Sequence, residues 1–242
     1  MRVVLITGGS RGIGNAIARS ALDAGYAVHL LARDADVLRS SAAKLQSHGD
    51  VNYSVVDLAE SAAVVQFCRQ WQGEIHGLVN NAGYWLEDPV GTLDPQLFQA
   101  MLSVNLLAPY ILTKGMLGKI RRGGRVVNIA SQLGTQGRER MGAYSATKHG
   151  LVGLTKCWAP EVWEQGITVN VVCPGWVNTE SNRSDLSLLA AERGTTLEQE
   201  LGRIANTLAL RRFIEPEEVA NVVTFLLSGQ ASGITGQVYE IK

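Results

Sequence analysis

The chain has few cysteines and no metal-binding spacing, and these shortages exclude several classes of protein. Its three cysteines show no CxxC spacing, so neither a disulfide scaffold nor a cysteine-rich zinc site is expected. The four histidines form no HExxH pattern, and we expect no metal. Basic and acidic residues number 22 each, which argues against a nucleic acid or a membrane surface as the main partner.

Long hydrophobic runs are also missing. The apolar start, MRVVLITGGS, is too short for a signal peptide, and no window reaches about 18 uninterrupted apolar residues. Together with reduced cysteines, this predicts a cytoplasmic protein. Hydrophobic residues make up 46% and charged residues 18% of the 242 positions, which is ordinary for a globular protein large enough for one α/β domain.

What the chain does contain is a regular alternation of short β-branched runs and amphipathic helical segments. Strands are expected at 3–6, 27–32, 51–56, 76–80, 124–131, 167–174 and 237–241. Helices are expected between them, with the last at 216–227. This alternation predicts an α/β fold, a single Rossmann-like, doubly wound parallel sheet of about seven strands with helices on both faces. No linker interrupts it, so residues 1–242 are expected to form one domain.

The segment at about 178–212 departs from the alternation. It is polar at first and then helical in pattern, and it follows the carboxyl end of a predicted strand. A long insertion at that position is typical of a substrate lid. A helical pair packed on the body is the alternative.

The stretch AYSATKHG places Tyr144 four residues ahead of Lys148. On a helix these two side chains share one face, one turn apart. A neighbouring ammonium favours the phenolate and lowers the pKa of a tyrosine, which makes the pair a candidate acid/base. An isolated YxxxK is more often a surface coincidence, so the rest of the chain must decide.

A glycine-rich loop, TGGSRGIG at 7–14, lies between the first expected strand and helix. Glycines allow the backbone to approach a ligand, and the helix N-terminus offers free N–H groups to a phosphate. The spacing of Gly8, Gly12 and Gly14 is not GxGxxG, but the position at the first strand-helix turn favours a dinucleotide site.

The charges near this loop bear on the choice of cofactor. Arg33 follows the second expected strand and Arg11 lies in the glycine loop, and two guanidinium groups suit a 2′-phosphate. Asp34 comes next and is either a helix cap or an acceptor for the ribose hydroxyl of NAD. We therefore expect NADP(H) to be preferred, with NAD(H) possible.

Four motifs occur in a fixed order: TGGSRGIG, NNAG at 80–83, Ser131 ahead of the YxxxK pair, and PGWVNT at 174–179. In this order the chain resembles the short-chain dehydrogenase/reductase family over essentially its whole length. It is most similar to the branch of 3-oxoacyl-carrier-protein reductases. The resemblance implies an enzyme that transfers hydride between NAD(P) and a ketone or alcohol.

The resemblance also implies residue roles. Tyr144 is the acid/base, Lys148 lowers its pKa and holds the nicotinamide ribose, Ser131 hydrogen-bonds the substrate oxygen, and Asn105 positions a water behind the lysine. Asp57 is placed by the adenine, and Val177 and Thr179 at the nicotinamide amide and phosphates. The full expected cofactor set is Gly8, Ser10, Arg11, Gly12, Ile13, Gly14, Arg33, Asp57, Leu58, Asn80, Ala82, Gly83, Tyr144, Lys148, Pro174, Gly175, Val177 and Thr179.

The substrate is expected to be a small ketone or its alcohol. Tyr84, Trp85 and Trp176 follow NNAG and PG directly and are expected to line its pocket. In the reducing direction Tyr144 would give its proton to the carbonyl oxygen of a 3-oxoacyl thioester or another small carbonyl compound. An NAD-dependent alcohol dehydrogenase and a non-catalytic nucleotide sensor remain alternatives. The resemblance also implies a homo-oligomer, a tetramer or a dimer.

Overall fold

The computed structural model describes residues 2–242, and its seven strands form one parallel sheet. The strand order is β3-β2-β1-β4-β5-β6-β7. The strands are β1 (Val3–Thr7), β2 (Ala27–Ala32), β3 (Val51–Val55), β4 (Ile75–Asn80), β5 (Ile120–Ile129), β6 (Thr168–Pro174) and β7 (Val238–Ile241). The chain runs outward from β1 to β3, then returns past β1 to start β4, so the order reverses between β1 and β4. Ligands of such sheets bind at the carboxyl ends of the strands beside that reversal.

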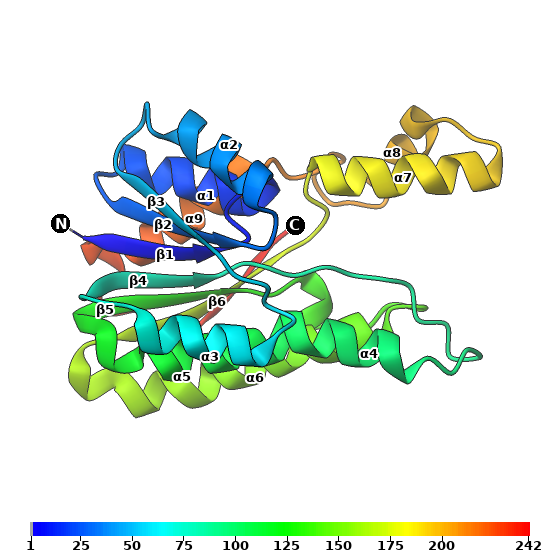
Figure 1. Cartoon of the computed structure of the whole chain (residues 1–242). Helices are drawn as coiled ribbons and strands as arrows, with labels where there is room; N and C mark the ends of the chain where they lie inside the picture. Colours follow the sequence, from blue (N-terminus) through cyan, green and yellow to red (C-terminus); the bar gives the residue numbers. More distant parts are fainter. Residues whose placement is uncertain (1) are drawn as a thin grey trace.

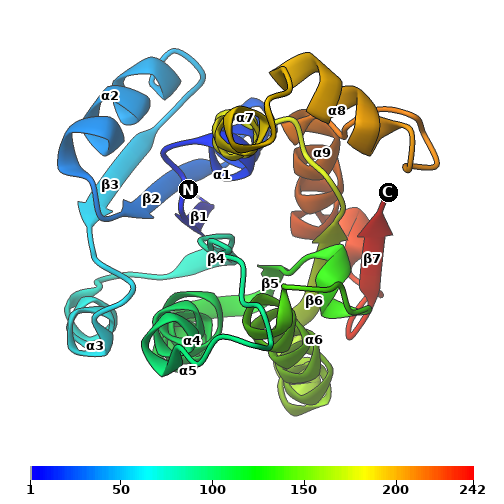
Figure 2. The ribbon, with the colours of Figure 1, turned by 90° about the vertical axis from the view of Figure 1, so that its right-hand side faces the viewer.

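Helices cover both faces of the sheet, which confirms the predicted doubly wound fold (Figures 1 and 2). On one face lie α1 (Gly12–Asp23), α2 (Ala35–Leu45) and α9 (Pro216–Leu227). On the other lie α3 (Ser61–Gln70), α4 (Pro95–Leu102), α5 (Ala108–Met116) and α6 (Gly142–Val162). The nearly continuous apolar strands, such as the fully buried β6, are what a sheet covered on both faces requires.

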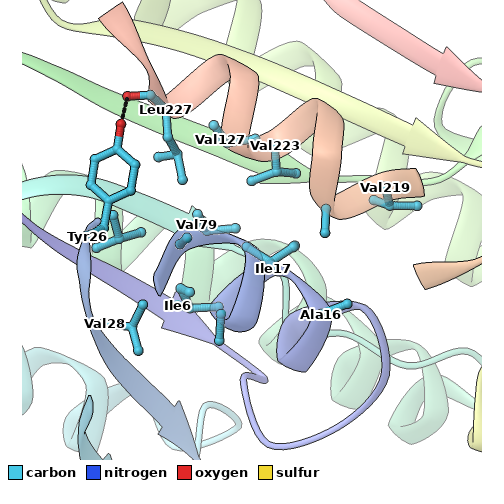
Figure 3. Packing of buried hydrophobic residues seen from close by; sticks show 14 of the residues in the cluster. Ile6, Ala16, Ile17, Tyr26, Val28, Val79, Val127, Val219, Val223 and Leu227 are labelled. Atoms are coloured by element: carbon cyan, nitrogen blue, oxygen red, sulfur yellow. Dashed lines mark hydrogen bonds between the residues drawn. The ribbon is translucent and has the colours of Figure 1, made fainter. Parts of the chain in front are cut away.

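The packing of α1 against α9 closes one face of the core (Figure 3). Ile17 of α1 and Val219 and Val223 of α9 are fully buried there. The Tyr26 hydroxyl donates a hydrogen bond of 3.0 Å to the carbonyl oxygen of Leu227, the last residue of α9. These contacts hold α9 against α1 and against the residue that precedes β2.

One long helical stretch contains an unexpected π-helical turn. Ser103–Leu107 is π-helical and joins α4 to α5, where the sequence indicated only ordinary helix between two strands. The whole stretch, Pro95–Lys119, is long and apolar enough to cross a membrane by length and composition alone. Met101, Leu112 and Met116 are buried against the body, so we describe it as a core helix.

Helices α7 (Glu180–Arg193) and α8 (Leu197–Ala205) form the segment between β6 and α9. They project beyond the carboxyl ends of the strands (Figure 1). A small cluster of their own, with Leu186, Ile204 and Phe213 buried at its centre, holds the two helices together. At the base of the segment a parallel bridge joins Val177 to Ile214.

The α1–α9 packing gives a stability prediction. We expect Ile17→Ala to lower the free energy of unfolding by about 2–5 kcal/mol, because it removes buried methyl groups and leaves a cavity. Ile17→Val removes one methyl group and should cost only about 0.5–1.5 kcal/mol. Urea unfolding measures both values. Equal losses for the two variants would contradict the close packing at this position.

Candidate active site

Two adjoining cavities open at the carboxyl ends of the strands. The smaller has a volume of about 410 Å³ and the larger about 1020 Å³. Ser131 and Tyr144 line both cavities and so lie where the two meet. Several residues of the expected cofactor set line the smaller cavity, namely Ile13, Gly83, Lys148, Pro174, Gly175, Val177 and Thr179. Trp176 and residues of α7 line the larger one.

Ser131 and Tyr144 reach this junction from two different elements. Ser131 follows β5 and caps a short 3-10 turn, where its Oγ accepts a hydrogen bond of 3.1 Å from the Leu133 amide. Tyr144 lies in the first turn of α6. Burial raises the pKa of Tyr144 to about 12, while a hydrogen bond with the Ser131 side chain acts to lower it. Without a ligand the phenol is therefore protonated at neutral pH.

Lys148 follows one turn later and is 3% exposed. Its Nζ donates a hydrogen bond of 2.9 Å to the carbonyl oxygen of Ile129 and lies 5.7 Å from the centre of the Tyr144 ring. Burial lowers the pKa of Lys148 to about 8. Desolvation of the phenol is the largest influence on the pKa of Tyr144 in this ligand-free protein, and the lowering of that pKa by Lys148 stays a prediction.

Asn105 lies within the π-helical turn and is fully buried. Its Oδ1 accepts a 3.0 Å hydrogen bond from the Tyr84 amide, and its Nδ2 donates to the Tyr84 carbonyl at 2.8 Å and to the Thr147 hydroxyl at 3.2 Å. These contacts hold the loop after β4 against α6. The predicted water-positioning role of Asn105 stays a prediction.

Gly83 has no room for a side chain at this point. A Cβ there would meet the Asn105 Oδ1 at 3.0 Å and the Lys148 Nζ at 3.1 Å. The NNAG motif therefore ends in glycine because its backbone passes directly over the lysine.

The glycine loop is built for close backbone approach. Gly8 has a φ of 66°, and a Cβ on Gly14 would lie 2.2 Å from the Gly8 carbonyl oxygen. A Cβ on Gly12 would meet Thr179 at 3.3 Å, so this loop and the PGWVNT motif adjoin. Arg11 at the N-cap of α1 makes no side-chain cap, and the first turn has no acid. The free N–H groups there suit a phosphate.

Arg33 and Asp34, the two residues expected to contact the ribose of the cofactor or its 2′-phosphate, make different contacts in the structure. Asp34 caps α2, accepting a 3.1 Å hydrogen bond from the Val37 amide, and lies 3.9 Å from Arg11. Arg33 makes no ion pair within the described chain, residues 2–242. Asp57 accepts a 2.9 Å hydrogen bond from the Ala59 amide, and Leu58 is buried beside it.

The Asn80 side chain points into the body of the protein. It is 1% exposed and donates to Thr113 at 3.1 Å and to Asn128 at 2.8 Å, so it crosslinks β4, α5 and β5. Its role in cofactor binding stays a prediction. Asn81 takes the position beside the glycine loop and donates to the Thr7 carbonyl at 2.9 Å. The Thr7 hydroxyl accepts from the Asn81 and Ala82 amides, a role that sequence reasoning missed.

The expected substrate residues divide between the two cavities. Trp85 lines both, Trp176 lines only the larger, and Tyr84 lines the smaller one beside Lys148. Their roles in substrate binding stay predictions. Trp176 packs against Phe213, with ring centres 5.8 Å apart. The Arg138 guanidinium lies over the Trp176 ring, 5.2 Å from its centre. Asn182 and Asp185 of α7 also line both cavities, and no sequence motif marked them.

The comparisons with known proteins agree with this geometry. The family described as short chain dehydrogenase matches residues 2–187. The chain is 37% identical, over 99% of its length and 91% of the relative's, to a Streptomyces violaceoruber protein named for ketoacyl reduction by the granaticin polyketide synthase. It is 32% identical to the Escherichia coli 3-oxoacyl-[acyl-carrier-protein] reductase FabG, covering all of this chain and 96% of FabG.

Solved structures give the same result. The actinorhodin polyketide ketoreductase with NADPH superposes with a TM-score of 0.92 at 33% identity, over 99% of this chain and 95% of the other. The L-sorbose reductase of Gluconobacter frateurii, complexed with NADPH and L-sorbose, gives 0.94 at 30% identity over 100% and 95%.

A dinucleotide-type sheet with a serine, a tyrosine and a lysine around a cavity at the carboxyl ends of its strands is typical of a nucleotide-dependent oxidoreductase. The chain belongs to the short-chain dehydrogenase family, and it is an NAD(P)-dependent enzyme.

The buried lysine gives a prediction on stability. At pH 7 we expect Lys148→Met to raise the free energy of unfolding by up to about 3 kcal/mol, because the variant no longer buries an ammonium. The pKa of Lys148 is lower in the folded protein than in the unfolded chain. The contribution of Lys148 to the free energy of unfolding is therefore present above the unfolded pKa of 10.5 and is lost as pH falls through about 8. Denaturant unfolding at pH 7 and pH 10 should therefore show a smaller difference at pH 10. A variant that is less stable at pH 7 would contradict this account.

Proposed function

We propose that this protein reduces a ketone to a secondary alcohol with NADPH and that Tyr144 is the proton donor. The observation that carries the proposal is the position of the Ser131 and Tyr144 hydroxyls where the two cavities meet. A carbonyl in the larger cavity then has two hydroxyl donors at its oxygen, while the smaller cavity is left for the nicotinamide.

The residues around the smaller cavity fit NADPH. The uncapped N-terminus of α1 offers N–H groups to the phosphates, and Arg33 is free to pair with the 2′-phosphate, since Asp34 is engaged as a helix cap. Val177 and Thr179 would hold the nicotinamide end. When bound, NADPH supplies the hydride that reaches the carbonyl carbon. Relatives of known structure that are described with NADPH support this choice.

Side chains of this protein bind and protonate the carbonyl oxygen of the substrate. Tyr144, protonated at neutral pH, gives its proton to the oxygen as negative charge develops there, and Ser131 donates a hydrogen bond to the same oxygen. The Lys148 ammonium stabilises the resulting tyrosinate through its positive charge. Because its pKa is about 8, Lys148 is charged at neutral pH and is well suited to pass a proton back to Tyr144.

The substrate is a small molecule carried in the larger cavity, and a 3-oxoacyl thioester or another carbonyl compound suits its size. Relatives named for ketoacyl, acetoacetyl-CoA and L-sorbose reduction support carbonyl reduction in general. We also propose that residues 1–242 act as one domain, with 178–212 as a lid. The separate cluster under α7 and α8, together with Leu186 and Leu189 in the cavity wall, supports this role.

Removing one oxygen atom tests the proton donor. Tyr144→Phe should still bind NADPH but turn over ketones at least about a hundredfold more slowly, because the proton source is lost with little change of shape. Tyr110→Phe, on the exposed side of α5, is the control and should retain activity. Steady-state kinetics and NADPH titration measure both. Near-normal turnover by Tyr144→Phe would eliminate the assigned role.

The choice of cofactor is tested at Arg33. Arg33→Asp should weaken NADPH binding by about tenfold or more, since a charged hydrogen bond contributes roughly 1.5–3 kcal/mol, and should leave NADH binding nearly unchanged. Arg39→Asp, on an exposed face of α2, controls for the change of net charge. Fluorescence titrations with both nucleotides give the comparison. An equal loss for NADPH and NADH would refute 2′-phosphate recognition. Tight NADPH binding without turnover of any ketone would favour the nucleotide-sensing alternative.

A further inference from the structure

The helix that carries Tyr144 begins without a cap of its own. Met141 is the N-cap residue of α6, and its side chain makes no cap hydrogen bond. The first turn of a helix leaves several backbone N–H groups without partners, and a cap normally satisfies one of them. Tyr144 belongs to this first turn, so any fraying there would move the phenol.

A residue from a distant loop supplies the missing cap. The Asp88 carboxylate accepts a hydrogen bond of 3.0 Å from the Ala143 amide, across 55 positions of sequence. The same oxygen lies 3.3 Å from where a Cβ on Gly142 would be, so it is in van der Waals range of the helix start. Asp88 is partly buried there, between the loop and the helix.

The backbone of Asp88 strengthens this attachment. Its amide donates to the Arg140 carbonyl at 2.7 Å, and Asp88 and Met141 form a parallel bridge. Pro89 follows and restricts Asp88 to the extended conformation that such a bridge needs. The neighbouring Glu87 carboxylate accepts hydrogen bonds from Arg140 at 2.8 Å and 2.5 Å. Arg140 itself has a φ of 61°, an uncommon conformation for a residue other than glycine.

The loop that provides Asp88 also forms part of the reaction cavities. Trp85 and Leu86, two to three residues earlier, line both of them. One carboxylate therefore joins the wall that faces the substrate to the turn that carries the proton donor.

We propose that Asp88 is a positioning residue that holds Tyr144 in its reactive place by capping α6 from the substrate loop. This inference rests on the proposed role of Tyr144 in ketone reduction. Asp88 touches neither the reacting carbonyl nor Tyr144 itself, so its effect passes through the Ala143 amide. A displacement of about 1 Å at a reacting group can lower a rate by about a hundredfold, which makes such a cap kinetically visible.

The test compares two aspartate caps. Asp94 is the N-cap residue of α4 and accepts a hydrogen bond of the same length, 3.0 Å, from the Leu97 amide, but the first turn of α4 carries no proposed site residue. We expect Asp88→Ala to lower kcat by about ten- to a hundredfold with NADPH affinity unchanged. Asp94→Ala should lose similar thermal stability, a few °C at most, with kcat unchanged.

Asp88→Asn keeps an oxygen that can accept from Ala143 and should recover most of kcat. Hydrogen exchange gives a readout that does not depend on turnover. The backbone amides of residues 142–148 should exchange faster in Asp88→Ala than in the wild type. In Asp94→Ala the same amides should exchange at the wild-type rate.

The outcomes are distinct. Unchanged exchange at 142–148 in Asp88→Ala would overturn the cap, and faster exchange with normal kcat would overturn the positioning role. Equal losses of kcat in Asp88→Ala and Asp94→Ala would also overturn it, because the effect would then be general destabilisation. If the wild-type enzyme reduces no ketone, the proposed function fails, and the exchange result still decides whether Asp88 caps the helix.

Discussion

The burial of one ammonium group, that of Lys148, governs the arrangement around it. The group needs an acceptor, and the Ile129 carbonyl at the end of β5 provides one at 2.9 Å. It also leaves no space for a side chain at residue 83, where only glycine fits beside Asn105. Asn105 in turn bonds both backbone groups of Tyr84. One buried charge thereby ties together a strand end, a loop and two helices.

Most of the fold could be predicted from the alternation of apolar runs. The strand at 27–32 and the helix at 216–227 were predicted with the bounds they have, because glycines, prolines and charged residues flank them clearly. The π-helical turn at 103–107 was missed, since its residues are apolar and compatible with an ordinary helix. Asn105 lies within this turn, and its side chain accepts a hydrogen bond from the Tyr84 amide, in a loop 21 residues earlier.

The site was predictable where a motif keeps its residues together, and less so where partners meet only in space. Gly83, Ser131, Tyr144 and Lys148, which come from three motifs, all line the smaller cavity. For two neighbouring asparagines, strand alternation decides which one faces inward, and Asn80 proved to be the inner one. The pKa of Tyr144 depends on burial, which sequence spacing does not reveal. Asp185 lines both cavities because of how α7 lies, and α7 carries no recognisable motif.

The segment of α7 and α8 leaves and rejoins the body at a single place. The Asn178 amide donates to the Ile214 carbonyl at 2.7 Å, and the Ile214 amide donates to the Trp176 carbonyl at 2.9 Å. The two ends of this segment are neighbours, and its helices pack on an apolar cluster of their own. A segment with these properties can be exchanged for another without disturbing the rest of the fold. Evolution or an engineer can replace it, and so reshape the mouth of the larger cavity, while the sheet and Tyr144 stay where they are.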